Sequence, residues 1–244
     1  MSLSTEIDRA IEEFGLIDGD YFTTMGTADF PREQFVESQI QYYRAVEQFS
    51  RVLMMAALRL EDVDSRTLLL DNVWEEHGEG DARRAHIRQF GLLLFNLGGI
   101  TTREIEARRI CPEVMIFNSA LFGLLSMERW PKGLAALGVI ERMFIGISSR
   151  IGNELVARGW IAADTLTHYN LHAELDVKHA NDLFHIVERH AWDDQSQRGE
   201  IIDGLRFGAA LFGGMYQGIF TRRATLSRFI DPAVDQPSRV IGAA

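Results

Sequence analysis

The chain has 244 residues, 46% of them hydrophobic and 25% charged, an ordinary composition for one globular domain. A net charge of −10 without a basic stripe argues against nucleic acid and anionic membranes as partners. A single cysteine, Cys111, excludes an internal disulfide and any site built from several thiolates. Because no signal peptide and no membrane-spanning apolar run is visible, we expect a cytoplasmic protein.

Hydrophobic residues recur with a period near 3.6 along almost the whole chain, which predicts helices throughout. The breaks carry start and stop signals: Gly98 and Gly99 before a capping Thr102, Pro131 at a helix start, and Gly159 at a helix end. We predict an all-α bundle of seven or eight helices in one domain, with a core over 30–228 and an irregular tail at 229–244. The predicted helices cover about residues 4–15, 31–60, 63–97, 101–109, 112–128, 131–158, 163–190 and 195–228.

Polar side chains interrupt the apolar faces of four of these helices. The stretch HAELDVKH places His172, Asp176 and His179 within roughly 60° of one another around a helix. Glu141 stands among Leu, Val, Ile, Met and Phe, where an ionised carboxylate needs a partner. Each group alone has an ordinary explanation, such as a solvated helix face or a salt bridge.

Two further segments carry acidic residues. Glu47 lies on an apolar helix, where it could simply pair with Arg44 or Arg51. The stretch EEHGEGDARRAH contains Glu75, Glu76, Glu79 and His86, and its two glycines, which are costly inside a helix, indicate local irregularity. Counting one glutamate from this stretch, four carboxylates and three imidazoles without a thiolate suit two iron or manganese ions better than one zinc ion. A ferritin-like site is excluded because the chain contains no Glu-x-x-His motif.

These motifs resemble the haem-oxygenase-like di-iron oxidases and oxygenases, relatives of the TenA, PqqC and haem oxygenase folds. The resemblance covers about residues 30–190 and implies a haem-oxygenase-like bundle that binds two iron ions as Fe²⁺, with manganese as the alternative. Glu75 and Glu79 are alternatives to Glu76, which the spacing of the family favours. The ligands that the resemblance implies are Glu47, Glu76, His86, Glu141, His172, Asp176 and His179.

The resemblance also implies an activity. Members of the family activate dioxygen on small molecules, so we expect an oxidase or oxygenase acting on a small carboxylate-bearing metabolite, first of all an amino acid or a derivative. An external electron donor and a homodimer are expected partners. The alternatives are a metal-free enzyme of cofactor metabolism like TenA or PqqC and a non-catalytic binding protein. One branch of the family consumes its own tyrosine and uses a lysine; the helix after Glu141 offers Arg150 and no lysine, which argues against that branch.

Residues outside the ligand set are expected to support it. His168, one turn before His172, should orient a ligand or line the pocket. A substrate carboxylate needs a cationic anchor, and with two lysines in the chain an arginine is the expected donor. The candidates are Arg51, Arg150 and Arg206. Small residues along the last helix allow either tight helix packing or a slot for an elongated ligand.

Overall fold

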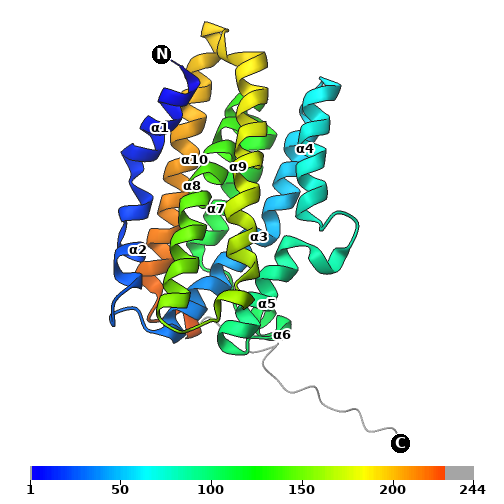
Figure 1. The fold of residues 1–244 in the computed structure, drawn as a ribbon. Helices are drawn as coiled ribbons and strands as arrows, with labels where there is room; N and C mark the ends of the chain where they lie inside the picture. Colours follow the sequence, from blue (N-terminus) through cyan, green and yellow to red (C-terminus); the bar gives the residue numbers. More distant parts are fainter. Residues whose placement is uncertain (1, 229–244) are drawn as a thin grey trace, which may run out of the picture.

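The computed structural model describes residues 2–228, except for the side chains of residues 167 and 170–174. This part of the chain forms ten α-helices and no strand (Figure 1), so the predicted all-α class is confirmed. Eight of these helices have twelve or more residues, as the predicted seven or eight require. The predicted tail at 229–244 lies outside the described residues. The helices are α1 (Leu3–Phe14), α2 (Asp20–Met25), α3 (Arg32–Leu58), α4 (Val63–Glu76), α5 (His86–Gly98), α6 (Thr102–Ala107), α7 (Pro112–Met127), α8 (Trp130–Ala157), α9 (Thr167–Val187) and α10 (Gln195–Arg222).

The helix predicted over 63–97 is two helices, because a tight turn separates α4 from α5. Gly78 and Gly80 adopt φ of +81° and +90°, and Glu79 between them adopts +56°. A Cβ atom at Gly78 would lie 2.3 Å from the carbonyl oxygen of Asp81, so only glycine fits there. The irregularity that the glycines indicated is therefore a tight turn, and the loop that contains it brings Glu76 at the end of α4 within hydrogen-bonding distance of His86 at the start of α5.

Two smaller boundaries also differ from the prediction. The cap of α6 is Thr101 rather than Thr102: its side chain accepts a hydrogen bond from the Glu104 backbone N–H, and Glu104 reciprocates, which is the three-residue spacing of a capping box. The core starts earlier than residue 30, since Leu3, Ile7 and Ala10 of α1 are buried, and α1 packs against α10.

Three long helices, α8, α9 and α10, lie side by side in the centre of the bundle (Figure 1). The approach of α10 to α8 depends on glycine: a Cβ atom at Gly204 would lie 2.3 Å from the Lys132 carbonyl oxygen, and one at Gly208 would lie 2.5 Å from that of Ala136. The small residues of the last helix are predicted to allow either tight packing or a ligand slot, and at Gly204 and Gly208 they allow tight packing.

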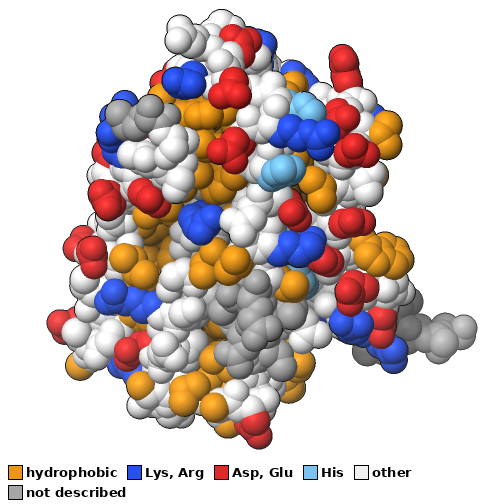
Figure 2. All heavy atoms as spheres, turned by 45° about the horizontal axis from the view of Figure 1, so that its top comes forward, with side chains coloured by type: hydrophobic (Ala, Val, Ile, Leu, Met, Phe, Trp, Pro, Cys, Tyr) orange, Lys and Arg blue, Asp and Glu red, His pale blue; other side chains and the backbone are white. Residues whose placement is uncertain are grey.

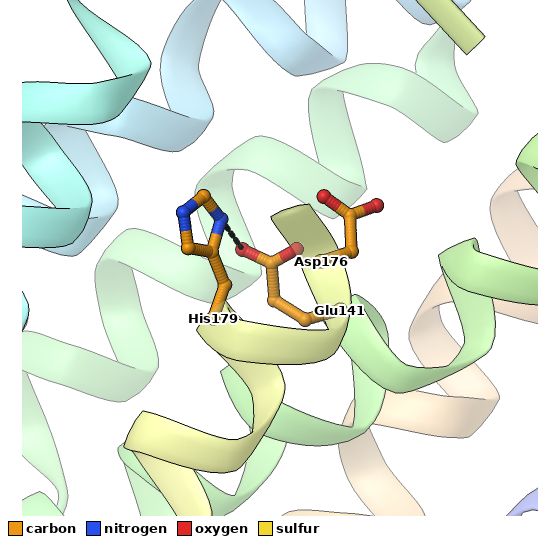
Figure 3. Close-up of side chains that lie close together, drawn as sticks. All are labelled: Glu141, Asp176 and His179. Carbon is orange, nitrogen blue, oxygen red and sulfur yellow. Dashed lines mark ion pairs between the residues drawn. The ribbon is translucent and has the colours of Figure 1, made fainter. Parts of the chain in front are cut away.

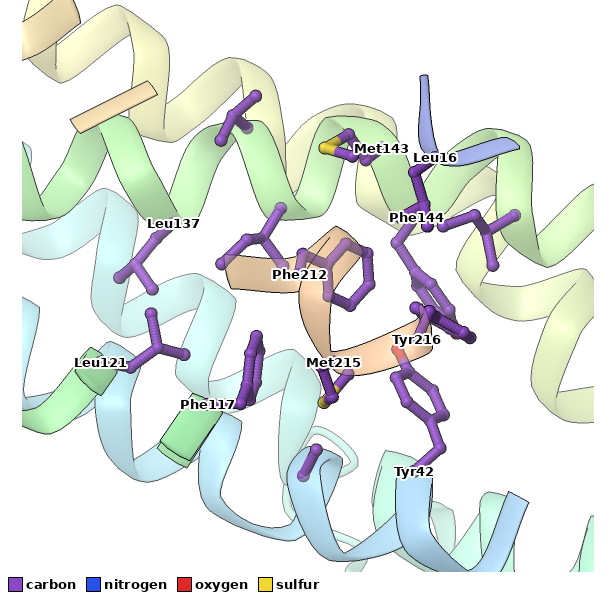
Figure 4. Packing of buried hydrophobic residues seen from close by; sticks show 14 of the residues in the cluster. Leu16, Tyr42, Phe117, Leu121, Leu137, Met143, Phe144, Phe212, Met215 and Tyr216 are labelled. Carbon is purple, nitrogen blue, oxygen red and sulfur yellow. The ribbon is translucent and has the colours of Figure 1, made fainter. Parts of the chain in front are cut away.

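Aromatic rings fill the space between α3, α8 and α10 (Figure 4). The Tyr42 ring lies 5.2 Å from that of Tyr216, 5.6 Å from that of Phe144 and 6.4 Å from that of Phe212. Phe144 stands one turn beyond Glu141 on α8, so this apolar wall adjoins the carboxylate that the sequence singled out.

The surface shows no segregation of charge on the face in Figure 2, where acidic and basic side chains are mixed. Among the described residues, no helix is both long and apolar enough to cross a membrane.

Candidate metal centre

Glu141 of α8 meets Asp176 and His179 of α9 inside the bundle (Figure 3). One ligand atom from each of the three lies within 4.8 Å of the others, and all three side chains are buried. The geometry follows from the helices: residues three apart share a face, and that face of α9 packs directly on α8. The structure thus brings together three of the predicted ligands.

Burial and neighbouring carboxylates both act on the charge of Glu141. Burial raises the pKa of the Glu141 carboxyl well above its ordinary value, and the nearby charges of Asp176 and Glu76 raise it further. Glu141 Oε1 and His179 Nδ1 lie 4.0 Å apart, and neither has a hydrogen-bond partner among the described residues. Buried polar atoms without partners are costly, and a cation between these oxygen and nitrogen atoms would satisfy both. The donor set therefore fits a metal ion.

Glu76 and His86 extend the cluster from the other side. Glu76 is the last residue of α4 and His86 the first of α5, and the glycine turn places His86 Nδ1 2.9 Å from Glu76 Oε1. The same Glu76 oxygen lies 3.9 Å from His179 Nδ1. Five of the seven predicted ligands thus form one connected group of carboxylates and imidazoles.

Glu75, Glu76 and Glu79, the alternatives for one ligand position, lie in different places in the structure. Glu75 faces the far side of His179, whose Nε2 lies 2.8 Å from Glu75 Oε2. Partial burial raises the pKa of the Glu75 carboxyl, but hydrogen bonds from His179 and Lys178 outweigh this and hold the pKa below its ordinary value. Glu79 pairs with Arg84 in the exposed turn. Among the three, Glu76 alone is near both His86 and the Nδ1 of His179.

Lys178 is a neighbour of the site that the sequence argument missed. Its Nζ lies 3.3 Å from Glu75 and 3.2 Å from Asp182. The argument against the lysine-using branch considered only the helix that carries Glu141, so it does not hold. The available signal was that one of two lysines in the chain directly precedes His179.

Two predicted ligands are not brought to the cluster by any described contact. Glu47 is partly exposed and pairs with Arg44 at 3.2 Å, the alternative that the sequence left open. The side chain of His172 lies outside the described residues. The complete seven-ligand set therefore stays a prediction.

His168 is fully buried, and its ring stacks on Phe90 with centroids 4.4 Å apart and planes 8° from parallel. Its predicted role, to orient a ligand or line the pocket, stays a prediction.

The three candidate arginines lie away from the cluster. Arg51 is exposed and donates to Gln48, and Arg206 pairs with Glu13 on the surface. Arg150 donates to the backbone carbonyls of Ile17 and Phe22. Nine residues separate Arg150 from Glu141, which is two and a half helical turns, so the two side chains leave opposite faces of α8. No described contact brings these arginines to the cluster, and an arginine anchor from this set stays a prediction.

A narrow cavity of about 40 Å³ reaches the cluster between α3, α7, α8 and α10. It is lined by Tyr42, Ala45, Val46, Phe49, Glu76, Phe117, Ile140, Glu141, Phe144 and Phe212. Its charged lining groups are the two glutamates, so a small, mostly apolar molecule that enters it would meet carboxylates at one end and aromatic rings elsewhere.

The comparison with protein families identifies the chain. A family described as "Iron-containing redox enzyme" matches residues 36–213. This chain belongs to that family. A 4-aminobenzoate synthase from Chlamydia muridarum is 21% identical over 198 residues, which cover 81% of this chain and 82% of that protein.

Solved structures agree on the fold. A domain of unknown function with a haem-oxygenase-like fold from Shewanella denitrificans has a TM-score of 0.78 at 9% identity and covers 93% of this chain and 95% of its own. A TenA homologue from Pseudomonas syringae has a TM-score of 0.73 at 13% identity, over 89% and 92%. The predicted haem-oxygenase-like fold and the resemblance to this family are therefore confirmed.

Proposed function

We propose that this member of the iron-containing family is a di-iron oxidase or oxygenase that activates dioxygen. The observation that carries the proposal is the buried group of Glu141, Asp176 and His179, whose ligand atoms converge and which Glu76 and His86 extend. Five oxygen and nitrogen donors exceed what one structural ion needs, and carboxylates with imidazoles suit iron. Glu47 and His172 complete the proposed ligand set.

When bound, two iron ions would supply the electrons and open coordination positions that dioxygen chemistry requires. The residues of the chain provide the rest. The carboxylates of Glu76, Glu141 and Asp176 would offset the charge of the ions, and the imidazoles would fix their positions. Phe144, Phe212 and Tyr42 keep the approach apolar, which limits access of water to the reacting atoms.

We propose a small carboxylate-bearing metabolite, an amino acid or a derivative, as the substrate. The name of the chlamydial relative gives 4-aminobenzoate, a small aromatic carboxylate, as the product of that protein, and this supports a small carboxylate-bearing compound as the class of molecule handled here. The cavity offers no arginine or lysine among its lining residues, so a substrate carboxylate held there would need the bound cations as its counter-charge. An external electron donor and a homodimeric assembly belong to the same proposal.

Anaerobic loading with ferrous ion followed by exposure to oxygen tests the function. The expected result is two iron ions per chain and oxygen consumption, and both should be lost in Glu141→Gln. Glu79→Gln, a change in the exposed turn, is the matched control and should retain both. A wild-type chain that binds no iron and consumes no oxygen would favour the metal-free enzyme or the binding protein instead.

A further inference from the structure

His179 lies between two acidic neighbours that face different atoms of its ring. On one side, Nε2 is 2.8 Å from Glu75 Oε2, a hydrogen-bonding distance. On the other side, Nδ1 is 3.9 Å from Glu76 Oε1 and 4.0 Å from Glu141 Oε1, too far for a hydrogen bond. The ring is fully buried, so water does not compete for either nitrogen.

The two contacts determine where a proton on the ring belongs. A neutral imidazole carries one N–H, and an ionised carboxylate only accepts hydrogen bonds. With the proton on Nε2, His179 donates to Glu75. With the proton on Nδ1, the lone pair of Nε2 would instead face the Glu75 oxygen at 2.8 Å, which is repulsive. The contact with Glu75 therefore favours the tautomer whose free lone pair, on Nδ1, points toward Glu141 and Glu76.

Lys178 holds the Glu75 carboxylate in this position. Its Nζ lies 3.3 Å from both carboxylate oxygens of Glu75 and also pairs with Asp182. Glu75 and Glu76 are adjacent at the end of α4, so their side chains leave the helix about 100° apart and reach opposite sides of the same imidazole.

We propose that Glu75 is a positioning residue: it accepts the Nε2 proton of His179 and so presents Nδ1 to the metal ions. The claim that Nδ1 faces metal ions rests on the proposed function. The claim that the proton of His179 is on Nε2 concerns the chain alone. Carboxylates that fix a metal-binding histidine in this way typically strengthen metal binding 10–100-fold.

Nitrogen NMR of the histidine side chains in the metal-free full-length chain tests the tautomer at pH 8.5. The expected result is a proton on Nε2 of His179 and none on Nδ1. A proton on Nδ1, alone or together with one on Nε2, would overturn the proposal. This measurement decides the inference even if the wild-type chain binds no metal, in which case the proposed function fails separately.

Binding of Zn²⁺, a diamagnetic probe, tests the claim that Nδ1 faces metal ions. In Glu75→Ala the dissociation constant should rise about 10–100-fold with an unchanged number of ions per chain. Glu75→Gln, whose amide oxygen still accepts from Nε2, should recover much of the affinity, and Glu79→Ala should leave it unchanged. Loss of one ion from Glu75→Ala would make Glu75 a ligand, and an unchanged affinity would deny it a role; either result overturns the proposal.

Discussion

At the scale of single residues, the site places several carboxyl groups in the buried interior of the bundle, where the ionised form is least stable. Glu141 and Asp176 are almost fully buried beside each other, and Glu76 adds a third carboxylate. Charged carboxylates in a poorly solvated interior repel one another and lose hydration, which costs stability unless a cation is present. Burial of these carboxylates is therefore expected to cost stability in a chain that holds no cation.

Glu141→Gln should stabilise the metal-free protein and abolish metal binding. The pKa of Glu141 is raised in the fold, so the folded state holds the proton more tightly than the unfolded state does. Stability from this group is thus greatest below its ordinary pKa of 4.5 and falls as pH rises through the raised value. At pH 7.5 the variant should melt several degrees higher, since about 1 kcal/mol corresponds to roughly 2–4 °C for a chain of this size.

Thermal melting of both proteins between pH 4 and pH 8, after treatment with a chelator, measures this effect. The gap between variant and wild type should widen with rising pH. A wild-type chain that is the more stable of the two at pH 7.5 would contradict the argument.

At the scale of the elements, the turn between α4 and α5 determines how Glu76 and His86 lie relative to each other. It connects Glu76 at the end of α4 to His86 at the start of α5, ten positions later, and brings their side chains within hydrogen-bonding distance. The turn requires three consecutive residues with positive φ, two of which are glycine. The position of His86 therefore depends on backbone conformation as well as on side-chain packing.

Gly78→Ala should damage the site more than it damages the rest of the fold. A Cβ atom there would lie 2.3 Å from the Asp81 carbonyl oxygen and 2.6 Å from the Ala85 nitrogen, so the turn must open and move His86. We expect a loss of about 2–4 kcal/mol in the free energy of unfolding, with reduced iron stoichiometry.

Gly99→Ala is the matched control, because Gly99 also has a positive φ of +71° but no neighbour within 4 Å of a Cβ atom. It should cost about 1 kcal/mol and leave iron binding intact. Equal iron stoichiometry in the two variants would show that the turn does not position the site. The melting temperature and the bound iron of each variant are the measurements.

At the scale of the whole molecule, α8 and α9 from the centre of the bundle meet α4 and α5 at the candidate metal centre. The candidate ligands come from two pairs of consecutive helices, and the pairs are far apart in the sequence, so bound ions would connect them. Anything that binds the folded chain and not the unfolded one stabilises the fold by mass action.

Ferrous ion added under anaerobic conditions should raise the melting temperature. At a free concentration 100 times the dissociation constant, one site contributes about 2.7 kcal/mol. Glu141→Gln should show a much smaller rise, and Glu79→Gln should behave like the wild type. If iron raised the melting temperature of Glu141→Gln as much as that of the wild type, the ion would be binding elsewhere.

Filling the cavity between α3, α7, α8 and α10 should slow oxygen consumption without removing iron. Ala45→Leu adds three carbon atoms to a space of about 40 Å³ beside Glu76 and Glu141. Its overpacking should cost about 1–3 kcal/mol in stability. Oxygen uptake and bound iron, measured together, separate this from simple unfolding. Ala45→Gly leaves the cavity open and should keep the rate; an undiminished rate in Ala45→Leu would show that another route supplies the site.

The sequence by itself determined the helices and the local relations within them. The hydrophobic period predicted an all-α chain, and helical spacing placed Asp176 and His179 on one face, because both depend only on neighbours along the chain. The same arithmetic places Arg150 on the face of α8 opposite Glu141. The resemblance to the family then supplied the fold and the set of expected ligands.

Only the tertiary structure decided which side chains meet. Glu75 and Glu76 are adjacent residues of the same type, so their roles cannot be told apart from residue type alone. Glu75 contacts Nε2 of His179 and Glu76 lies near its Nδ1, because of the way α4 is rotated about its axis where it packs near α9. Likewise, Arg150 donates to the backbone carbonyls of Ile17 and Phe22, which belong to a segment far away in the sequence. Contacts between helices depend on the angle at which the helices cross and on how far they are shifted along their axes. A local sequence pattern does not determine these quantities.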